Sequence, residues 1–413
     1  MVKRVLLVRH GESEANAGEI WQGATSSPLT ARGRHQAGLA ADRLAGRRFD
    51  LVVSSDLERS LHTAEIAGFR PRVETVWREG DIGVWEGRPG EWVEAHYGQD
   101  LDRLREDYDL RMGETGESPR QVSERGREAL AGLVDRLEEG QTGLVFTHGG
   151  LIELLLWPLL GLPIGRRRLG FLSNTSFCEL AFDGEEASIL RYNDAAHLGP
   201  VSYWADFTRD AGGIVVDLIR HGVTQANLER RAQGRVDSDL HPEGREQALR
   251  LAPWIGDVDE VFSSTLRRAA STAEIAFGRP PVLADELVEM SFGEWEGELW
   301  EELEASGRLG GYPHDGQDIR RGGTGETWSE VQDRVAGFIS SLTDTYAGRR
   351  VAAASHGGAI KAYSTAILGL EYGKAGLLGP LENTSVTQVA ITPDGHATLA
   401  TYNITHHLEG QDG

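Results

Sequence analysis

A chain of 413 residues is too long for one ordinary hydrophobic core, and its length predicts two or more domains. Its formal net charge of −22 argues against a nucleic-acid-binding protein, because such proteins present basic surfaces. No apolar run approaches the roughly 18 residues of a membrane-spanning helix, and a single cysteine, Cys178, excludes an internal disulfide framework. We therefore expect a cytoplasmic protein that contacts neither membranes nor nucleic acids.

The first predicted strand is the apolar run of residues 5–8, which ends in Arg9-His10-Gly11. Such a run is typical of a buried strand, and the glycine after it lets the chain turn at little steric cost. Arg9 and His10 are therefore expected at the carboxyl end of a strand, where ligands bind in open α/β sheets. A helix is expected to begin near Thr30.

The next predicted strand, residues 51–53, leads into Ser55 and Glu58, whose spacing is that of a capping box. We expect a helix to begin there and to carry Arg59 in its first turn, close to the strand ends. A further helix is expected to begin at Ser118, because a proline follows at the first helical position, where proline is favoured.

Residues 144–146 form another predicted strand, which runs into His148-Gly149-Gly150 and a leucine-rich helix. His148 should then lie where the backbone N–H groups and the positive end of a helix dipole face outward, an arrangement that favours an anion. Short strands that alternate with helices in this way predict βαβ units.

The same motifs occur a second time along the chain. His221 stands in a second Arg-His-Gly, 211 positions after His10 (221 − 10), and His356 follows His148 by 208 positions (356 − 148). Near-constant spacing over the whole length predicts two homologous domains rather than a short solenoid repeat.

The repeat predicts the domain organisation and the fold class. We expect one domain over residues 1–203 and a second over residues 212–413, with a linker near residues 199–213. The predicted class is α/β, with two tandem three-layer α/β/α domains, each built on a mostly parallel sheet with helices on both faces.

Four motifs in one order, each present twice, resemble the histidine phosphatase superfamily, which has the phosphoglycerate-mutase-like fold. The first copy has Arg9-His10-Gly11, Arg59 in Ser-Ser-x-Leu-x-Arg, Glu79 ahead of Gly-x-Trp-Glu-Gly, and His148-Gly149-Gly150. The second copy has Arg220-His221-Gly222, Arg268, Glu289 and His356-Gly357-Gly358. The resemblance covers nearly the whole chain and implies a tandem of two such domains.

The resemblance implies a role for each matched residue. His10 and His221 would be nucleophiles that form a phosphohistidine, and Glu79 and Glu289 would protonate the leaving oxygen. The side chains that would hold the phosphoryl oxygens are those of Arg9, Arg59, His148, Arg220, Arg268 and His356. Further residues that would line the phosphate pocket are Asn16, Gln22 and Gly23, with Asn227, Gln233 and Gly234 in the second copy. The resemblance implies no metal and no cofactor.

These residue types suit phosphoryl transfer, which needs mainly positioning and neutralisation of charge. A nucleophilic histidine must present a neutral ring nitrogen, so its other nitrogen needs a hydrogen-bond acceptor. The planar fork of arginine suits phosphate better than the point charge of lysine. A general acid such as Glu79 should be partly desolvated, with a raised pKa, and Asp81 and Glu86 are rival acids nearby.

Three functions are compatible with these motifs. The first is a metal-independent phosphatase that hydrolyses a small phosphate monoester, with a site in each domain; we favour this one. The second is a phosphoglycerate-type mutase, against which stand Ala15 and Ala226, where such mutases have tryptophan. The third is a family member in which one domain is non-catalytic or the chemistry has diverged. The expected partner is a small phosphorylated substrate of unspecified identity, and the expected assembly is either a monomer with an intramolecular pseudo-dimer or a homodimer.

Overall fold

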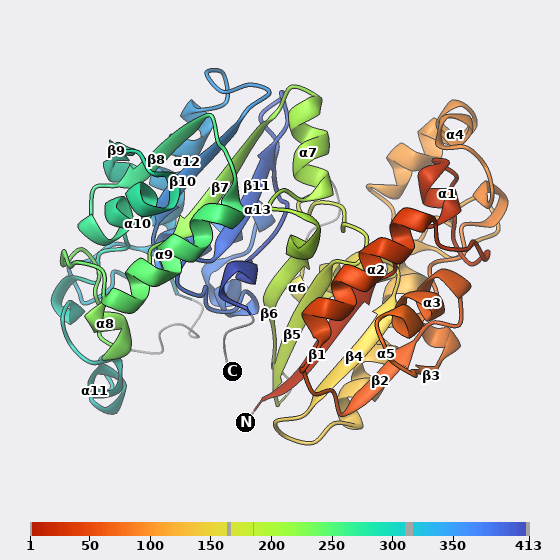
Figure 1. Cartoon of the computed structure of the whole chain (residues 1–413), viewed down its shortest axis with the longest axis horizontal. Coiled ribbons are helices and arrows are strands. Elements are labelled where there is room, and N and C mark those ends of the chain that lie inside the picture. The colour runs from red at the N-terminus through yellow and green to blue at the C-terminus, as the bar shows by residue number, and fades with distance from the viewer. Residues whose placement is uncertain (1, 163–166, 185, 310–316, 410–413) are drawn as a thin grey trace. The chain divides into compact units, whose positions relative to one another are not determined.

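Two structural units, each with its own six-stranded sheet, make up the computed structural model, which describes residues 2–162, 167–184, 186–309 and 317–409. The first unit comprises Met1–Arg167 and Phe171–Leu198, and the second comprises Arg168–Gly170 and Gly199–Gly413. Figure 1 shows the elements of each unit in the colour order of the chain.

The sheet of the first unit has the strand order β3-β2-β4-β1-β5-β6. Its strands are β1 (Lys3–Arg9), β2 (Leu51–Ser54), β3 (Arg72–Val73), β4 (Thr142–Thr147), β5 (Phe177–Asp183) and β6 (Glu186–Asp194). Strands β3, β2, β4 and β1 run parallel, whereas β5 pairs antiparallel with β1 and β6 antiparallel with β5. Arg9 at the end of β1 lies opposite Thr147 at the end of β4, so both strands deliver their next residue to one edge of the sheet.

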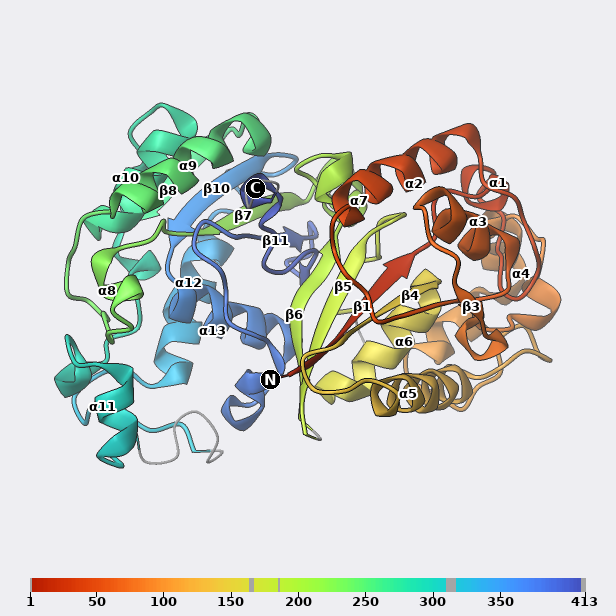
Figure 2. The same ribbon diagram turned by 60° about the horizontal axis from the view of Figure 1, so that its bottom comes forward.

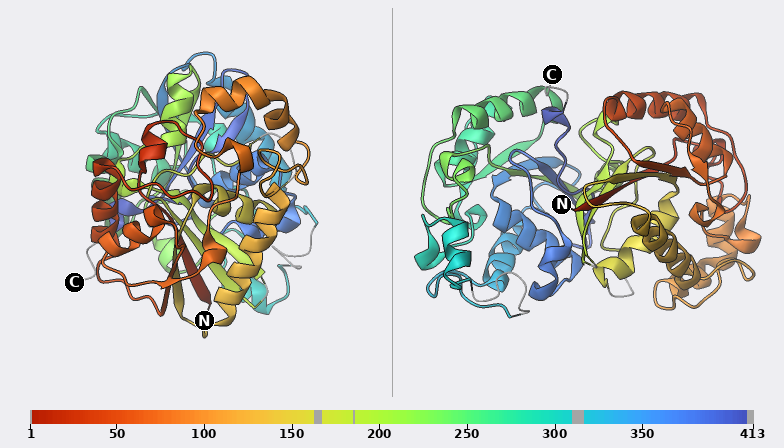
Figure 3. Two further views of the ribbon diagram at one scale, coloured as in Figure 1. Left: turned by 90° about the vertical axis from the view of Figure 1, so that its right-hand side faces the viewer. Right: turned by 90° about the horizontal axis from the view of Figure 1, so that it is seen from below.

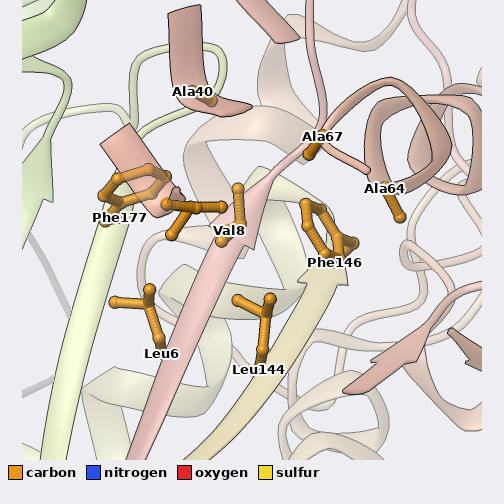
Figure 4. Close-up of a cluster of buried hydrophobic side chains, with 9 residues drawn as sticks. Leu6, Val8, Ala40, Ala64, Ala67, Leu144, Phe146 and Phe177 are labelled. Atoms are coloured by element: carbon orange, nitrogen blue, oxygen red, sulfur yellow. The ribbon is translucent and has the colours of Figure 1, made fainter. Parts of the chain in front are cut away.

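Helices cover both faces of this sheet, as predicted. They are α1 (Glu14–Ala17), α2 (Ala31–Leu44), α3 (Glu58–Ile66), α4 (Gly90–Leu104), α5 (Pro119–Asp135) and α6 (Gly149–Leu160). Figure 2 shows α2 and α3 on one side of the strands, with α5 and α6 on the other. Fully buried apolar strand residues such as Leu6 and Phe146 pack against Ala40 of α2 and Ala64 of α3 (Figure 4).

Local capping explains where several helices begin. Thr30 caps α2 by accepting a hydrogen bond from the N–H of Gly33, and Ser118 forms a capping box before α5, so both predicted helix starts are confirmed. The predicted capping box at Ser55 is wrong. The N-cap of α3 is Leu57, which makes no side-chain cap, and the hydroxyl of Ser55 instead accepts from the Leu57 N–H and bonds to a histidine 93 residues away.

The second unit repeats this topology, with the order β12-β11-β7-β10-β8-β9. Its strands are β7 (Ile214–Arg220), β8 (Glu260–Ser264), β9 (Val282–Ala284), β10 (Arg350–Ser355), β11 (Val386–Ile391) and β12 (Ala397–Leu399). Its helices are α8 (Gln225–Leu228), α9 (Pro242–Ile255), α10 (Arg267–Phe277), α11 (Trp300–Ala305), α12 (Trp328–Ser341) and α13 (Gly357–Leu368). Figure 3 shows helices on both sides of its strands. Strand β7 thus takes the place of β1, and β10 that of β4, again in parallel.

The segment expected to link the two domains contains a helix, α7 (Tyr203–Asp210), which belongs to the second unit. Ser202 caps it, and Ala205 and Trp204 pack on Val215 of β7. Among the described helices, none has both the length and the apolar character needed to cross a bilayer.

Candidate active site

Two histidines meet at the carboxyl edge of each sheet. His10 follows β1 and His148 follows β4, and the N–H of His10 donates to the carbonyl of Thr147 at 3.0 Å. The ring centroids of His10 and His148 lie 5.1 Å apart, and those of His221 and His356 in the second unit are also 5.1 Å apart. Parallel pairing of two strands that end together therefore brings residues far apart in sequence into one site.

A backbone carbonyl fixes the tautomer of each candidate nucleophile. His10 Nδ1 lies 2.7 Å from the carbonyl oxygen of Gly11, and His221 Nδ1 lies 2.7 Å from that of Gly222. Because a carbonyl oxygen can only accept, Nδ1 carries the proton and Nε2 keeps its lone pair. Burial, with the nearby Arg59 and Arg9, holds the pKa of His10 well below its usual range, so the ring stays neutral.

Asparagines on the loop before β5 and β11 hold the main chain of both nucleophiles. The side-chain amide of Asn174 donates to the carbonyl of His10 at 3.1 Å, and that of Asn383 donates to the carbonyl of His221 at 2.9 Å. These asparagines belong to a repeated Asn-Thr-Ser, but an isolated asparagine carries no sequence pattern that would have assigned it this role.

Arg59 is buried and held by three hydrogen bonds. Its Nη1 donates to the carbonyl of Thr25 and its Nη2 to the carbonyl of Gly23, both at 2.8 Å, and its Nε donates to His10 Nε2 at 3.2 Å. Burial lowers its pKa to about 10, which leaves the guanidinium cationic at neutral pH. Gly23 therefore acts by orienting Arg59 through its carbonyl.

Arg268 is held in the same way in the second unit. It donates to the carbonyls of Gly234 and Val236 at 2.8 Å each, although its Nε donates to Nδ1 of His356 rather than to the candidate nucleophile. Arg9 and Arg220 donate to the carbonyls of Leu172 and Leu381.

The carboxylate of Glu79 faces the beginning of α6. It accepts from the N–H of Gly150 and from that of Gly80, both at 3.0 Å. Burial raises its pKa despite the opposing charges of Arg59 and Arg9. Glu289 makes the equivalent contacts in the second unit, accepting from the N–H groups of Met290 at 2.8 Å and Gly358 at 3.2 Å, and it also accepts from that of Ala359 at 3.0 Å.

Glycine lets the helix backbone pass close to these carboxylates in their present positions. A Cβ atom at Gly150 would lie 2.7 Å from Oε1 of Glu79, and one at Gly358 would lie 2.6 Å from Oε1 of Glu289. The second glycine of each His-Gly-Gly motif thus allows the backbone of the helix to approach the acid closely.

Each set of side chains opens on one cavity. The first cavity measures about 190 Å³, and the predicted residues that line it are Arg9, His10, Asn16, Gln22, Arg59 and Glu79. The second measures about 270 Å³, and the predicted residues that line it are Arg220, His221, Asn227, Gln233, Gly234, Arg268 and Glu289. The rival acids do not line the first cavity: Glu86 binds the backbone of Gly23 and Ala24, and Asp81 that of Gly83.

Three predicted residues lie behind the cavity walls rather than in them. His148 and His356 are fully buried, and their Nε2 atoms bond to the hydroxyls of Ser55 at 2.9 Å and Ser264 at 2.8 Å. Gly23 is the third. Burial and the neighbouring arginine hold the pKa of both histidines well below the usual range, so they are neutral in this arrangement.

Asn16 and Gln22 are positioned by the short helix α1. Ser13 and Asn16 form a capping box, and the hydroxyl of Ser13 also donates to Oε1 of Gln22 at 3.0 Å. In the second unit Thr224 and Asn227 form the equivalent capping box, and the side-chain amide of Gln233 donates to the hydroxyl of Thr224.

Several cavity residues were not predicted as site residues, although the two glycines among them belong to the His-Gly-Gly motif. In the first unit they are Gly149, Gly150, Glu153, Phe171 and Leu172. In the second unit they include Phe292, Trp300, Trp328, Lys361, Tyr372 and Leu381. The helical spacing after each His-Gly-Gly could have indicated Glu153 and Lys361, which lie one turn along the same helix face. The described part of the chain groups no three His, Cys, Asp or Glu side chains that could hold a metal ion.

Two known proteins illustrate the similarity, and each aligns with less than half of this chain. A glucosyl-3-phosphoglycerate phosphatase of Mycolicibacterium vanbaalenii is 37% identical over 192 residues, which are 44% of this chain and 84% of the relative. A probable phosphoglycerate mutase GpmB of Serratia proteamaculans is 36% identical over 177 residues, 42% of this chain and 82% of the relative.

Among solved structures, a mycobacterial glucosyl-3-phosphoglycerate phosphatase in complex with VO3 aligns with a TM-score of 0.41 and 33% identity, over 45% of this chain and 96% of that one. A phosphoserine phosphatase mutant of Entamoeba histolytica in complex with phosphoserine aligns with a TM-score of 0.43 and 31% identity, over 47% and 98%.

The profile of one family matches the chain twice, over residues 5–195 and again over residues 216–405. Together these two matches span most of the 413 residues and contain all four motifs of each copy. The chain belongs to the histidine phosphatase superfamily (branch 1), of which it carries two tandem copies.

Proposed function

We propose that each domain hydrolyses a small phosphate monoester through a phosphohistidine, without a metal ion. The observation that carries the proposal is the convergence of one neutral imidazole nitrogen, two guanidinium groups and one carboxyl group on a single cavity in each unit. Each hydrogen bond between a charged donor and a phosphoryl oxygen contributes about 1.5–3 kcal/mol, so the two arginines hold a phosphate despite the net negative charge of the chain.

The first step transfers the phosphoryl group to the protein. Nε2 of His10 attacks phosphorus, the bond from phosphorus to the ester oxygen breaks, and Glu79 gives its proton to the leaving alkoxide. Burial favours the protonated form of Glu79 that this step needs. Arg9 and Arg59 neutralise the charge on the phosphoryl oxygens, and His221, Glu289, Arg220 and Arg268 do the same work in the second domain.

The second step releases the product. Glu79, now a carboxylate, takes a proton from water, the resulting hydroxide oxygen bonds to phosphorus, and the bond from phosphorus to Nε2 breaks. Inorganic phosphate leaves, and both Glu79 and His10 return to their starting protonation states. Support for both roles of Glu79 is that it lines the same cavity as His10 and is held there by the N–H of Gly150.

Release of inorganic phosphate from p-nitrophenyl phosphate in EDTA tests this function. We expect turnover by the wild-type protein, partial turnover by His10→Ala and by His221→Ala, and none by the double variant, which controls for contaminating phosphatases. No turnover by the wild-type protein, on this ester and on a panel of sugar and nucleotide phosphates, would refute the proposal. A mutase would instead isomerise phosphoglycerate in a reaction that needs a bisphosphate primer.

The protein is further proposed to work in the cytoplasm. Its one cysteine, Cys178, is a buried free thiol, which suits a reducing compartment.

A further inference from the structure

One aligned wall position carries opposite charges in the two cavities, and the second cavity also has Arg231 where the first unit has Ile20. Glu153 in α6 and Lys361 in α13 each stand three residues after the second glycine of a His-Gly-Gly motif, and each lines its cavity. The equivalent position therefore carries a carboxylate in the first unit and an ammonium group in the second. The catalytic residues around it are otherwise of the same types in both units.

In the first unit the charge at this position is neutralised by the protein itself. Oε2 of Glu153 accepts a hydrogen bond from Nη1 of Arg167 at 2.6 Å. The guanidinium group of Arg167 also lies 3.6 Å from the ring centroid of Phe171, another residue of the cavity wall. A ligand in the first cavity thus meets an ion pair whose two charges already balance each other.

In the second unit the corresponding charge has no counter-ion. No described residue forms an ion pair or a hydrogen bond with Lys361, and the cavity wall around it includes Trp328, Tyr372 and Leu381. Burial alone lowers its pKa to about 8, so the amine is still mostly protonated at neutral pH. An unpaired ammonium group held among aromatic and apolar side chains is costly, and an anion that enters the cavity would relieve that cost.

The other cations of the second cavity have partners. Arg231 donates to Glu229 at 2.6 Å and to the carbonyl of Gly297 at 2.9 Å. Arg220 and Arg268 are bound to backbone carbonyls at the candidate phosphoryl site, where the proposed mechanism assigns both charges to the phosphoryl group. Lys361 is therefore the cation of this cavity whose charge is left for a second group of the ligand.

The position of Lys361 limits where that second group can be. Gly358 touches the carboxylate of Glu289, and Lys361 is three residues further along the same helix, hence on the same face and about one turn away. One helical turn is about 5.4 Å, so the anionic group stands only a few bonds from the phosphate. A single ammonium group balances a monovalent carboxylate, whereas a second phosphate would carry about two charges.

We propose that the second domain selects phosphate monoesters that carry a carboxylate, which pairs with Lys361, and that the first domain has no such preference. This inference rests on the proposed phosphatase function. The chain then holds two active sites with the same chemistry and different substrate ranges, set by the Glu153–Arg167 pair in one domain and by Lys361 in the other.

Competition in single-site proteins tests the proposal. His10→Ala leaves only the second site and His221→Ala only the first, and hydrolysis of p-nitrophenyl phosphate reports on each. The competitors are 3-phosphoglycerate and glycerol 3-phosphate, which differ by a carboxylate in place of a hydroxymethyl group. Their inhibition constants can be measured whether or not either ester is turned over.

We expect the second site to bind 3-phosphoglycerate at least tenfold more tightly than glycerol 3-phosphate, since a charged hydrogen bond is worth a tenfold or larger factor. Lys361→Met should reduce that ratio to about threefold or less. Lys361→Arg, which changes the packing but keeps the charge, should retain most of it. The first site should show a ratio near one.

Two failures are distinguishable. If neither single-site protein hydrolyses p-nitrophenyl phosphate, the phosphatase function is refuted, and this inference with it. If both hydrolyse it and Lys361→Met leaves the ratio of the second site unchanged, or if the first site shows the same ratio as the second, only the selectivity inference is overturned.

Discussion

A methyl group at Gly150 should disable the first site while leaving the fold intact. The Cβ atom of Gly150→Ala would lie 2.7 Å from Oε1 of Glu79, whereas ordinary contacts begin near 3.4 Å, so the carboxylate must retreat by about 0.7 Å (3.4 − 2.7). The clash is with the end of a flexible side chain, and alanine is a better helix former than glycine by about 0.5–1 kcal/mol. Stability should therefore change little.

The loss should appear in the chemistry. A displacement of roughly 1 Å costs on the order of 10²-fold in rate, and the whole contribution of a general acid is about 10²–10⁴-fold. We expect kcat for p-nitrophenyl phosphate to fall by about 10²-fold when Gly150→Ala is made in the His221→Ala background. Gly358→Ala in the His10→Ala background should behave alike, because its Cβ would lie 2.6 Å from Glu289.

The matched control is Gly132→Ala, an exposed helical glycine of α5 whose added Cβ would meet nothing within 4 Å. That variant should keep full activity and gain slightly in melting temperature. The reasoning is refuted if Gly150→Ala keeps kcat within about threefold of its parent, or if it loses activity only because it unfolds at the assay temperature.

Two further predictions concern the arginines and the buried histidines. Arg59→Lys in the His221→Ala background should lower kcat/KM by at least about tenfold, because lysine lacks the planar fork with which Arg59 holds the carbonyls of Gly23 and Thr25 and still presents N–H groups to a phosphate. An unchanged kcat/KM would show that Arg59 does not bind the phosphoryl group. Thermal denaturation should show stability falling as the pH drops below about 6.5, because burial lowers the pKa values of His10, His148, His221 and His356 in the folded protein and the unfolded chain then binds more protons. The raised pKa values of Glu79 and Asp217 act in the opposite direction, since their contribution to stability is present at low pH and is lost as the pH rises through those pKa values. Four histidines outweigh two carboxyl groups, and a melting temperature that is constant or rises between pH 7 and pH 5 would contradict the neutral state assigned to them.

The sequence was sufficient to predict the edge of the sheet where the site lies. Strands 5–8 and 144–146 were visible as short apolar runs, and the glycines after His10 and His148 marked where each strand ends. Parallel pairing then required both histidines to meet, which the 5.1 Å ring separation reflects. These features are local in sequence, which is why pattern alone could find them.

The walls of the cavities and one helix start could not be predicted in this way. Phe171 and Leu172 reach the first cavity from an irregular segment before β5, where no periodicity indicates which side chains face inward. The capping box expected at Ser55 failed because its hydroxyl is engaged by His148, a tertiary contact that local spacing does not reveal.

The opposite charges of Glu153 and Lys361 are evident when the two halves of the sequence are aligned. Their meaning depends on knowing that both side chains line a cavity and that only Glu153 has an ion-pair partner among the described residues. That information comes from packing between helices and loops, not from the motif spacing.

Trapping the phosphorylated protein tests the central claim most directly. Rapid mixing with p-nitrophenyl phosphate, quenching under alkaline conditions and peptide mass spectrometry should locate a phosphoryl group on the imidazole of His10 and on that of His221, and each should vanish in the corresponding alanine variant. A phosphoryl group on another side chain, or turnover that persists in the His10→Ala/His221→Ala double variant, would contradict the account.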